Sequence, residues 1–470
     1  MTAAGVFESL NRIVGVAPMR APAFAGGDPI VPTPFRVGDA AAAALGLGAS
    51  AAAEIWRLRG GSQQDISVDA RAAAASLISF ALLRLDGKQV PRPADTNPTV
   101  GIYRAGDGRY IHLHGGFPHL AKRTLDLLNA DNNADSISEA VAKWNSFALE
   151  DALAYLKQCG AVIRTREEWQ ESPQGEALAH VPPITLKRIG DAPPLRLADS
   201  QTPLAGIRVL DLTRVLAGPS AGRTLASHGA DVLGVRGPDL PTIDLFDLDT
   251  GLGKRSCFLD LAKPGDAETM RGLLRNAHVF IDSYRPGALA KLGFSPEALA
   301  HLTPGIIHVG VSCYGAMGPW ANRAGWEQLA QSATGIAVEQ GAFMASRNGS
   351  RRESVPHLIP AAACDFITGY LAAAGTIAAL LKRIREGGSW RVEVSLCATA
   401  MWLQSLGEVE RARIPEAWNP LAGLDGYFQS CETTRGRLDH LGPVVRMSKT
   451  PPAWRLPPPV IGADAPRWPN

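Results

Sequence analysis

Net charge, paired cysteines and long apolar runs are all scarce in this sequence. Its 470 residues include 47 basic and 45 acidic side chains, so the formal net charge is only +2. This balance excludes a nucleic-acid-binding protein that relies on bulk charge, although a local basic cluster could still hold a phosphorylated ligand. The six cysteines form no Cys-x-x-Cys pair, which predicts reduced and mostly buried thiols.

Signals for secretion or membrane insertion are also lacking. The N-terminus has no succession of basic, apolar and small residues, and the longest apolar run, residues 40–53, is too short and too rich in alanine to span a bilayer. We therefore expect a soluble, cytoplasmic protein that binds neither membranes nor nucleic acids. A chain of 470 residues exceeds the usual size of a single core, so two domains are expected.

Strand and helix signals alternate in the middle of the chain. An apolar strand is predicted within residues 203–213, a helix at 220–225 and a second buried strand at 229–235. This order is typical of a parallel α/β unit, in which ligands bind beyond the carboxyl ends of the strands. The loops at 213–219 and 236–241 are therefore predicted to face a cleft.

One succession of features occurs twice. Each copy has a long helix, a Gly-Gly-Ser turn, a strand and a His-Pro block in the same order. These lie at residues 39–59, 60–62, 65–69 and 180–183 in the first copy and at 365–385, 387–389, 392–396 and 440–443 in the second. The spacing differs by one residue between the copies, and we interpret the repeat as an internal partial duplication.

The predicted fold is α/β, with a Rossmann-like parallel sheet, a smaller α+β domain and the partial duplication. We expect an irregular, Pro/Gly-rich arm at 1–35, a first module at 36–201 and an α/β module at 202–470. The first module would carry the small domain, with strands at 100–104 and 110–114 and helical segments near 117–129 and 136–158.

Cations recur next to the predicted strands of the α/β module. Lys254 and Arg255 stand just before a buried strand, and Arg285 follows another in a loop that leads to a Pro-Gly turn. A single cation is most often a solvated surface charge. Recurrence at successive strands favours a ligand with phosphates, because arginine offers forked donors and lysine a point charge to oxyanions.

An aspartate and a group of histidines are further candidates for a chemical role, and each has a structural alternative. Asp365 lies among apolar neighbours at the start of the long second-copy helix, where it could be an N-cap or a nucleophile toward an acyl group. His112 and His114 alternate on one predicted strand, with His119 following, but no cysteine or carboxylate cluster completes a metal site. We expect structural histidines and no bound metal.

Taken as a series, these motifs resemble the class III CoA-transferases (CaiB/BaiF type), a group that includes formyl-CoA transferase, carnitine CoA-transferase and α-methylacyl-CoA racemase. The resemblance covers residues 203–400, while the first half is similar to later family segments that include the small domain. Its motifs are residues 203–235, 253–261 and 283–287, Tyr314-Gly315 with Gly318-Pro319, and 365–395. Members of this family form interlocked dimers. In this chain the small domain precedes the α/β part, so the two incomplete halves are expected to complement one another within one chain. Whether the chain also forms a homodimer stays open.

The resemblance implies a mechanism and a site. Asp365 would attack the thioester carbonyl to give a mixed anhydride, CoA would return to give an aspartyl-CoA thioester, and an acceptor acid would take the CoA. Glu327 would help to organise the site, and Asp39, at the matching place in the first copy, is expected to be non-catalytic. The implied substrates are an acyl-CoA, as the coenzyme A thioester, and a small carboxylic acid. The implied CoA contacts are Arg214, Leu216, Ala217, Arg236, Lys254, Arg255, Ser283, Tyr284 and Arg285.

Two other functions stay open. The racemase branch has Gly-His-Asp where this chain has Gly325-Trp326-Glu327, and Trp326 cannot serve as the general base that α-proton exchange needs. Transfer is therefore favoured over racemisation or isomerisation. The second alternative is a non-catalytic acyl-CoA-binding protein.

Overall fold

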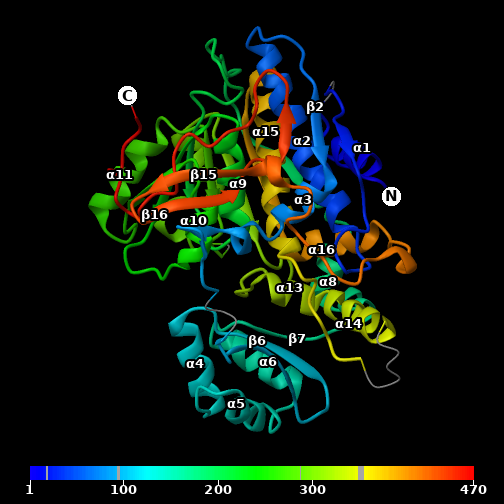
Figure 1. The fold of residues 1–470 in the computed structure, drawn as a ribbon. Coiled ribbons are helices and arrows are strands. Elements are labelled where there is room, and N and C mark those ends of the chain that lie inside the picture. Colours follow the sequence, from blue (N-terminus) through cyan, green and yellow to red (C-terminus); the bar gives the residue numbers. More distant parts are fainter. Residues whose placement is uncertain (17–18, 93–95, 286, 348–353, 470) are drawn as a thin grey trace.

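A seven-stranded sheet forms the centre of the computed structural model, which describes residues 1–470 except 17–18, 93–95, 286, 348–353 and 470 (Figure 1). Its strand order is β11-β10-β9-β12-β13-β14-β8. The strands are β8 (Thr185–Gly190), β9 (Arg208–Leu212), β10 (Asp231–Arg236), β11 (Lys254–Phe258), β12 (Val279–Asp282), β13 (Ile307–Ser312) and β14 (Ser389–Ser395). All are parallel except β8. The parallel strands follow the Rossmann order 3-2-1-4-5-6, which confirms the predicted fold class.

Alternate residues of these strands point into two cores. Val209 of β9 belongs to the core that includes α9 (Ala217–Ser227) and α15 (Ala363–Glu386). Leu210, its neighbour, belongs to the core that includes α11 (Pro264–Leu274) and α12 (Pro296–Leu302). Because both faces are covered, the central strands β9, β10, β12 and β13 are mostly apolar, which is why the sequence shows short apolar runs there.

The long helix α15 packs unusually close to its neighbours. A Cβ atom on Gly369 would lie 2.5 Å from the carbonyl oxygen of Ala217 in α9, so glycine permits the approach of the two helices. On its other side α15 packs against α2 (Val37–Leu58). Among the residues that the structure describes, α15 alone is long and apolar enough to cross a membrane, but its apolar window is wholly buried, as in the core helix of a globular protein.

The small α+β domain has its own sheet and core, and lies below the body in Figure 1. Its sheet has the order β5-β6-β7 and is antiparallel. The elements are β5 (Val100–Arg104), β6 (Tyr110–His114), α4 (Pro118–Leu128), α5 (Ala134–Val141), α6 (Ser146–Tyr155) and β7 (Gly160–Val162). The single helical segment predicted at 136–158 is two helices, because Asn145 caps a new helix by accepting from the N–H groups of Phe147 and Ala148.

The expectation of an irregular N-terminal arm is wrong for its first part. Ala3–Val14 form helix α1, whose buried positions Val6, Phe7, Leu10 and Val14 lie on one face. Thr2 caps it by accepting from the N–H of Gly5. Most of the prolines and glycines of the segment follow residue 14, and they obscured the helical period before them.

The two copies of the repeated pattern occupy equivalent places. Helix α2 leads to β2 (Ile66–Asp69), which is parallel to β1 (Ala23–Ala25) and antiparallel to β17 (Val445–Met447). Helix α15 leads to β14, which is parallel to β13 and antiparallel to β8. Each copy is thus completed by a strand from the other module: β8 comes from the first module and β17 from the second.

We predict that residues 202–470 alone do not fold stably, and that residues 1–201 supplied in trans restore a soluble complex. Without the first module, β14 loses its partner β8 and becomes an exposed edge, and Ile184 no longer packs against Gly375 of α15. Soluble yield and thermal unfolding by circular dichroism measure this. Cooperative unfolding of the isolated 202–470 piece, at the temperature of the whole chain, would contradict it.

Candidate active site

Asp365 lies in the first turn of α15, but it is not the N-cap. That position is Ala362, whose side chain caps nothing. Glu327, the first residue of α13 (Glu327–Ala333), caps the helix instead: its Oε1 accepts from the N–H of Cys364 at 3.1 Å and its Oε2 from the N–H of Asp365 at 2.5 Å. Of the two interpretations left open for Asp365, the N-cap is therefore excluded.

Glu327 is itself held by a side chain from the next turn of its helix. Gln331 donates from Nε2 to Oε1 of Glu327 at 2.6 Å and accepts at its own oxygen from the N–H of Ile359 at 2.9 Å. Both Glu327 and Gln331 are buried. The segment that leads into α15 is thus tied to α13 at two points, and this fixes where Asp365 lies.

Burial dominates the electrostatics of the two carboxyl groups. It raises the pKa of Glu327 to about 7, and burial together with the neighbouring Glu327 raises the pKa of Asp365 above its usual range. Three hydrogen bonds favour the ionised form of Glu327, whereas no described residue donates to the side-chain oxygens of Asp365. Glu327 therefore opposes the ionisation of Asp365, which is only 6% exposed.

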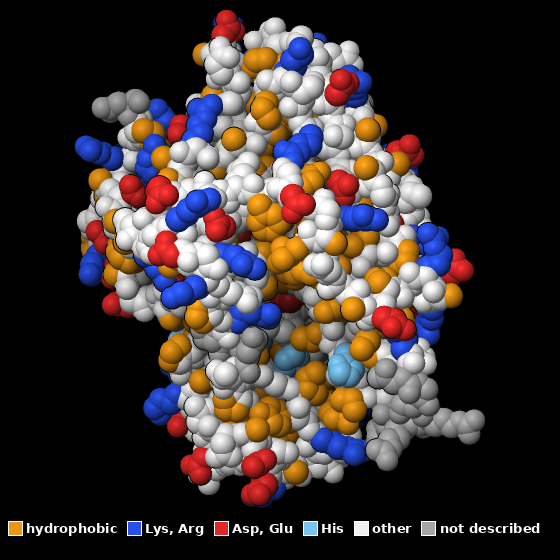
Figure 2. All heavy atoms as spheres, in the orientation of Figure 1, with side chains coloured by type: hydrophobic (Ala, Val, Ile, Leu, Met, Phe, Trp, Pro, Cys, Tyr) orange, Lys and Arg blue, Asp and Glu red, His pale blue; other side chains and the backbone are white. Residues whose placement is uncertain are grey.

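An aromatic wall stands beside this pair. Trp326 immediately precedes Glu327. The centre of its ring lies 4.3 Å from that of His114, on which it stacks, and 5.1 Å from that of Phe117. A Cβ atom on Gly116 would lie 2.7 Å from His114 and 3.3 Å from Trp326, so the small-domain loop closes tightly on the body. Figure 2 shows a hollow where the two parts meet, lined by hydrophobic side chains, with a histidine on its small-domain side and an acidic side chain deep inside.

The loop after β9 brings the first of the predicted CoA contacts to this place. Leu216 and Ala217 form the start of α9, and Ala217 touches Gly369, one turn beyond Asp365. Arg214 lies partly buried, with its guanidinium 5.2 Å from the ring of Phe117. Between them Val215 has φ +73°, a costly conformation for a β-branched residue and one that concentrates at functional sites.

The loop after β12 carries three more of the predicted contacts. Ser283, Tyr284 and Arg285 are exposed there, while Pro286 lies outside the described residues. Tyr284 is close enough to Arg214 for that cation to counter the rise in tyrosine pKa that burial causes. Tyr284 and Arg285 also line a cavity of about 420 Å³ that includes the Asp282–His308 pair but not Asp365.

The structure does not bring the remaining predicted contacts to the site as free cations. Lys254, 6% exposed, donates to Oδ2 of Asp211 and to the carbonyl of Pro219, both at 2.7 Å. Arg236 pairs with Asp247 at 2.5 Å, and Arg255 lies 3.9 Å from Asp231. The direct CoA contact of Lys254 stays a prediction: its charge is balanced inside the protein, where it ties β9 to the start of α9, and it lines a small cavity with Arg236 and Arg255.

The first copy has a similar carboxylate pair with a different environment. The N–H of Asp39, in the first turn of α2, donates to Oδ2 of Asp28 at 2.8 Å, as that of Asp365 does to Glu327. Arg36 lies 3.4 Å from Asp39 and offers it a counter-charge that Asp365 lacks among the described residues. That Asp39 is non-catalytic stays a prediction.

The histidines of β6 have structural contacts. Nδ1 of His112 lies 2.9 Å from Oγ of Ser332, and His114 stacks on Trp326. Burial lowers the pKa of His112 to about 4 and that of His114 to about 3, so both are neutral at pH 7. They hold the small domain to α13.

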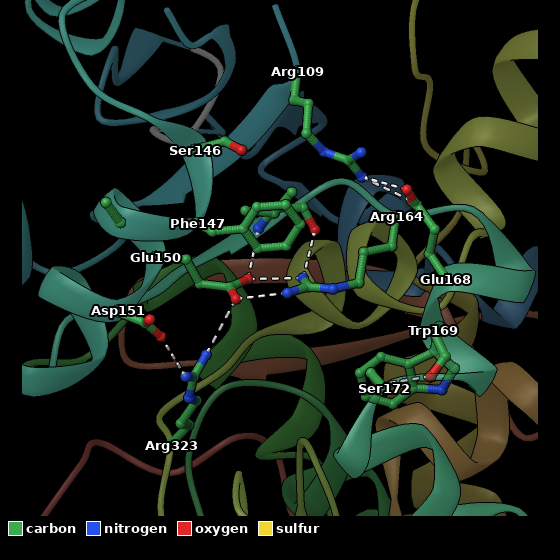
Figure 3. Close-up of polar contacts among 12 residues, drawn as sticks. Arg109, Ser146, Phe147, Glu150, Asp151, Arg164, Glu168, Trp169, Ser172 and Arg323 are labelled. Atoms are coloured by element: carbon green, nitrogen blue, oxygen red, sulfur yellow. Dashed lines mark hydrogen bonds and ion pairs between the residues drawn. The ribbon is translucent and has the colours of Figure 1, made fainter. Parts of the chain in front are cut away.

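Sequence reasoning missed the junction that holds the small domain in place (Figure 3). Figure 3 shows Arg164 and Arg323 pointing toward Glu150 from two sides. Arg164 donates to both oxygens of Glu150 at 2.8 and 2.7 Å, and Arg323, three residues before Trp326, lies 3.5 Å from Glu150 and 3.1 Å from Asp151. Arg323 is far from its partners in the sequence, so no local signal marks the junction.

The geometry is that of an α/β protein with a buried carboxylate at the carboxyl edge of its sheet, and sequence comparison then identifies the family. The model of CoA-transferase family III matches residues 9–196 and 204–417, most of the chain. The protein belongs to CoA-transferase family III, as predicted, and the two matched segments fit the interpretation of a partial duplication.

Relatives with curated names agree with this assignment. The acetyl-coenzyme A transferase nodX of Hypoxylon pulicicidum is 31% identical over 326 residues, which are 65% of this chain and 54% of that protein. An acyl-CoA transferase of Gibberella moniliformis is 29% identical over 419 residues, 80% of this chain and 72% of that protein. The chain thus spans about half the length of the first relative. The crystal structure of the hypothetical protein Rv3272 from Mycobacterium tuberculosis matches 44% of this chain and 59% of that one, at 30% identity and a TM-score of 0.39.

We predict that Asp365→Asn makes the protein more stable at alkaline pH. A carboxyl group with a raised pKa stabilises the fold below its unfolded pKa, and this contribution is lost as the pH rises through the folded pKa. The amide cannot ionise, so the variant should melt at least about 2 °C higher at pH 8 and show no such gain at pH 4. Thermal unfolding across pH measures the difference. The exposed Asp425→Asn serves as control, and an equal gain at both pH values would contradict the argument.

Proposed function

We propose that this protein is a CoA-transferase that moves CoA from an acyl-CoA thioester to a carboxylic acid. The observation that carries the proposal is the state of Asp365: a buried carboxyl group, positioned by Glu327, whose own oxygens accept no hydrogen bond from a described residue. A side chain held in place but left without partners suits a nucleophile.

The first half of the reaction uses Asp365 as a covalent carrier. After Asp365 loses its proton, one carboxylate oxygen attacks the thioester carbonyl, the C–S bond breaks, and CoA thiolate leaves a mixed anhydride. The thiolate then attacks the aspartyl carbonyl, which releases the donor acid and forms an aspartyl-CoA thioester. Burial leaves the ionised carboxylate poorly solvated and basic, which strengthens it as a nucleophile.

The second half runs the same steps with the acceptor. The acceptor carboxylate attacks the aspartyl-CoA carbonyl and expels CoA thiolate, which then attacks the acceptor acyl carbon of the new anhydride. A new acyl-CoA leaves, and the Asp365 carboxylate is restored. Both anhydrides would hydrolyse in water, so the wall of His114, Phe117 and Trp326 protects them by excluding solvent.

The geometry favours transfer over the racemase or isomerase alternative. Exchange of an α-proton needs a general base within reach of the substrate. Trp326 cannot act as one, and both oxygens of Glu327 accept hydrogen bonds from backbone N–H groups of α15. Glu327 therefore positions Asp365 rather than moving a proton.

Names of relatives suggest the substrate classes. A relative from Agrobacterium fabrum is named a succinate–glutarate CoA-transferase and one from Escherichia coli a formyl-CoA:oxalate CoA-transferase. By analogy the donor is an acyl-CoA and the acceptor a small carboxylic acid. We propose that CoA lies along the loops after β9 and β12, in contact with Arg214, Leu216, Ala217, Ser283, Tyr284 and Arg285.

Covalent trapping tests the proposal. The protein is incubated with a panel of acyl-CoAs, treated with hydroxylamine and digested, and mass spectrometry should find a hydroxamate at Asp365 and none at Asp39. Asp365→Asn should lose transfer by about 10³-fold or more, while its dissociation constant for acyl-CoA stays within about threefold. Deuterium uptake from solvent into the acyl group without an acceptor acid would support an isomerase instead, and binding without modification or turnover would support a binding protein.

We also predict that Glu327→Gln shifts the pH dependence of transfer. Removing the negative charge beside Asp365 lowers the pKa of Asp365, so the rising limb of kcat/KM moves to lower pH. The rate at the plateau should fall about tenfold or more, because the amide NH₂ replaces one acceptor of the α15 N–H groups. Gln331→Leu is the control, because it loosens the same cap but leaves the charge of Glu327 in place. It should lower the rate, and the pH of its rising limb should stay closer to that of the unaltered protein.

A further inference from the structure

Basic side chains from both domains meet beside the aromatic wall. Arg214 comes from the loop after β9, while His119 and Arg123 come from α4 of the small domain. Phe117 connects them: Arg214 lies 5.2 Å from the centre of its ring, and His119 stacks on it at 5.9 Å and 14°. His119 and Arg123 are four residues apart and so share one face of α4, the face beside Arg214.

The two arginines of this group lack carboxylate partners in the described part of the chain, while burial and the charges of Arg123 and Arg214 lower the pKa of His119. The hydrogen bond described for Arg214 runs from Nη1 to the carbonyl oxygen of Pro241 at 3.3 Å, and neither Arg214 nor Arg123 has an ion pair with a described residue. The contrast with Arg236, paired with Asp247, is sharp. Burial lowers the pKa of Arg214 most and the nearby Arg236 lowers it further, while Tyr284 and Asp247 counter part of this shift without an ion pair to Arg214.

The local backbone adds to the positive potential. Helix α9 begins after Leu216 and α4 after Phe117, and neither N-cap side chain accepts from the first turn. The contact between Arg214 and Phe117 brings these two helix starts together. Positive helix ends and unbalanced cations at one place favour a ligand with several negatively charged oxygens.

We propose that His119 and Arg123 of α4 bind an oxyanion of the substrate together with Arg214, so that the small domain takes part in substrate binding. The inference rests on the proposed function and names residues of the first module as part of the same site. A phosphate of the CoA ester and a second carboxylate of the acceptor share this chemistry. The charges of the two arginines favour the phosphate, and the experiment separates the two sources.

Arg123→Gln in the full chain is the test, with three donors that carry the same acyl group: the acyl-CoA, its 3′-dephospho analogue and the acyl-pantetheine. We expect KM for the acyl-CoA to rise roughly tenfold, as for the loss of one charge-assisted hydrogen bond, with kcat within about twofold. KM for the acyl-pantetheine, which has no phosphate, should not change. The dephospho analogue shows which phosphate is bound. If Arg123→Gln does not change KM for this analogue, the site binds the 3′-phosphate; if the substitution raises KM, the site binds the diphosphate.

Lys122→Gln is the matched control, because Lys122 is the neighbouring cation on α4 and is already paired with Asp126 at 2.8 Å. It should leave KM within about twofold. A rise in KM for a dicarboxylic acceptor alone would support the oxyanion site with the acceptor as its source. Calorimetry of acyl-CoA binding to Asp365→Asn, with and without Arg123→Gln, separates the remaining outcomes. If Arg123→Gln changes neither the binding nor the KM values, this inference alone is overturned. If neither form binds acyl-CoA, the proposed function is overturned as well.

Discussion

The cap that Glu327 provides to α15 is the interaction on which the site depends. The start of α15 has no cap of its own, and the unpaired N–H groups of its first turn would be costly in so buried a place. Glu327 satisfies two of them and so holds Asp365 at one point in space. Its negative charge also makes ionisation of Asp365 harder. One side chain therefore sets the position of the proposed nucleophile and, together with burial, raises its proton affinity.

Much of the fold could be predicted from the sequence, because its strands are covered on both faces and appear as short apolar runs. The Rossmann-like sheet, the small domain and the long helix before β14 followed from such runs and from the repeat. Helix α1 did not, because the prolines and glycines after residue 14 dominated the whole segment. Its apolar period at Val6, Leu10 and Val14 is short, and only packing against the body shows which face is buried.

The candidate site was predicted less evenly. Asp365 and Glu327 followed from the family resemblance, but the cap between them joins two helices, and no local pattern predicts which carboxylate reaches which N–H group. In the same way, a lysine before a strand shows nothing of the buried Asp211 that receives the charge of Lys254. The cations of α4 lie in the first module, and only the folded chain brings them beside Arg214. Cytoplasmic location and a homodimer stay predictions.

The joining of both copies in one chain has a consequence for how the site can change over generations. In a symmetric dimer a substitution appears in both subunits, so a change tolerated at one place must be tolerated at its symmetry mate. Here α2 and α15 are encoded separately, although they occupy equivalent places and each depends on a strand from the other half. Arg36 can therefore balance Asp39 while Asp365 keeps its unpaired carboxyl group. The first copy is free to specialise in support of the second, an asymmetry that identical subunits cannot evolve.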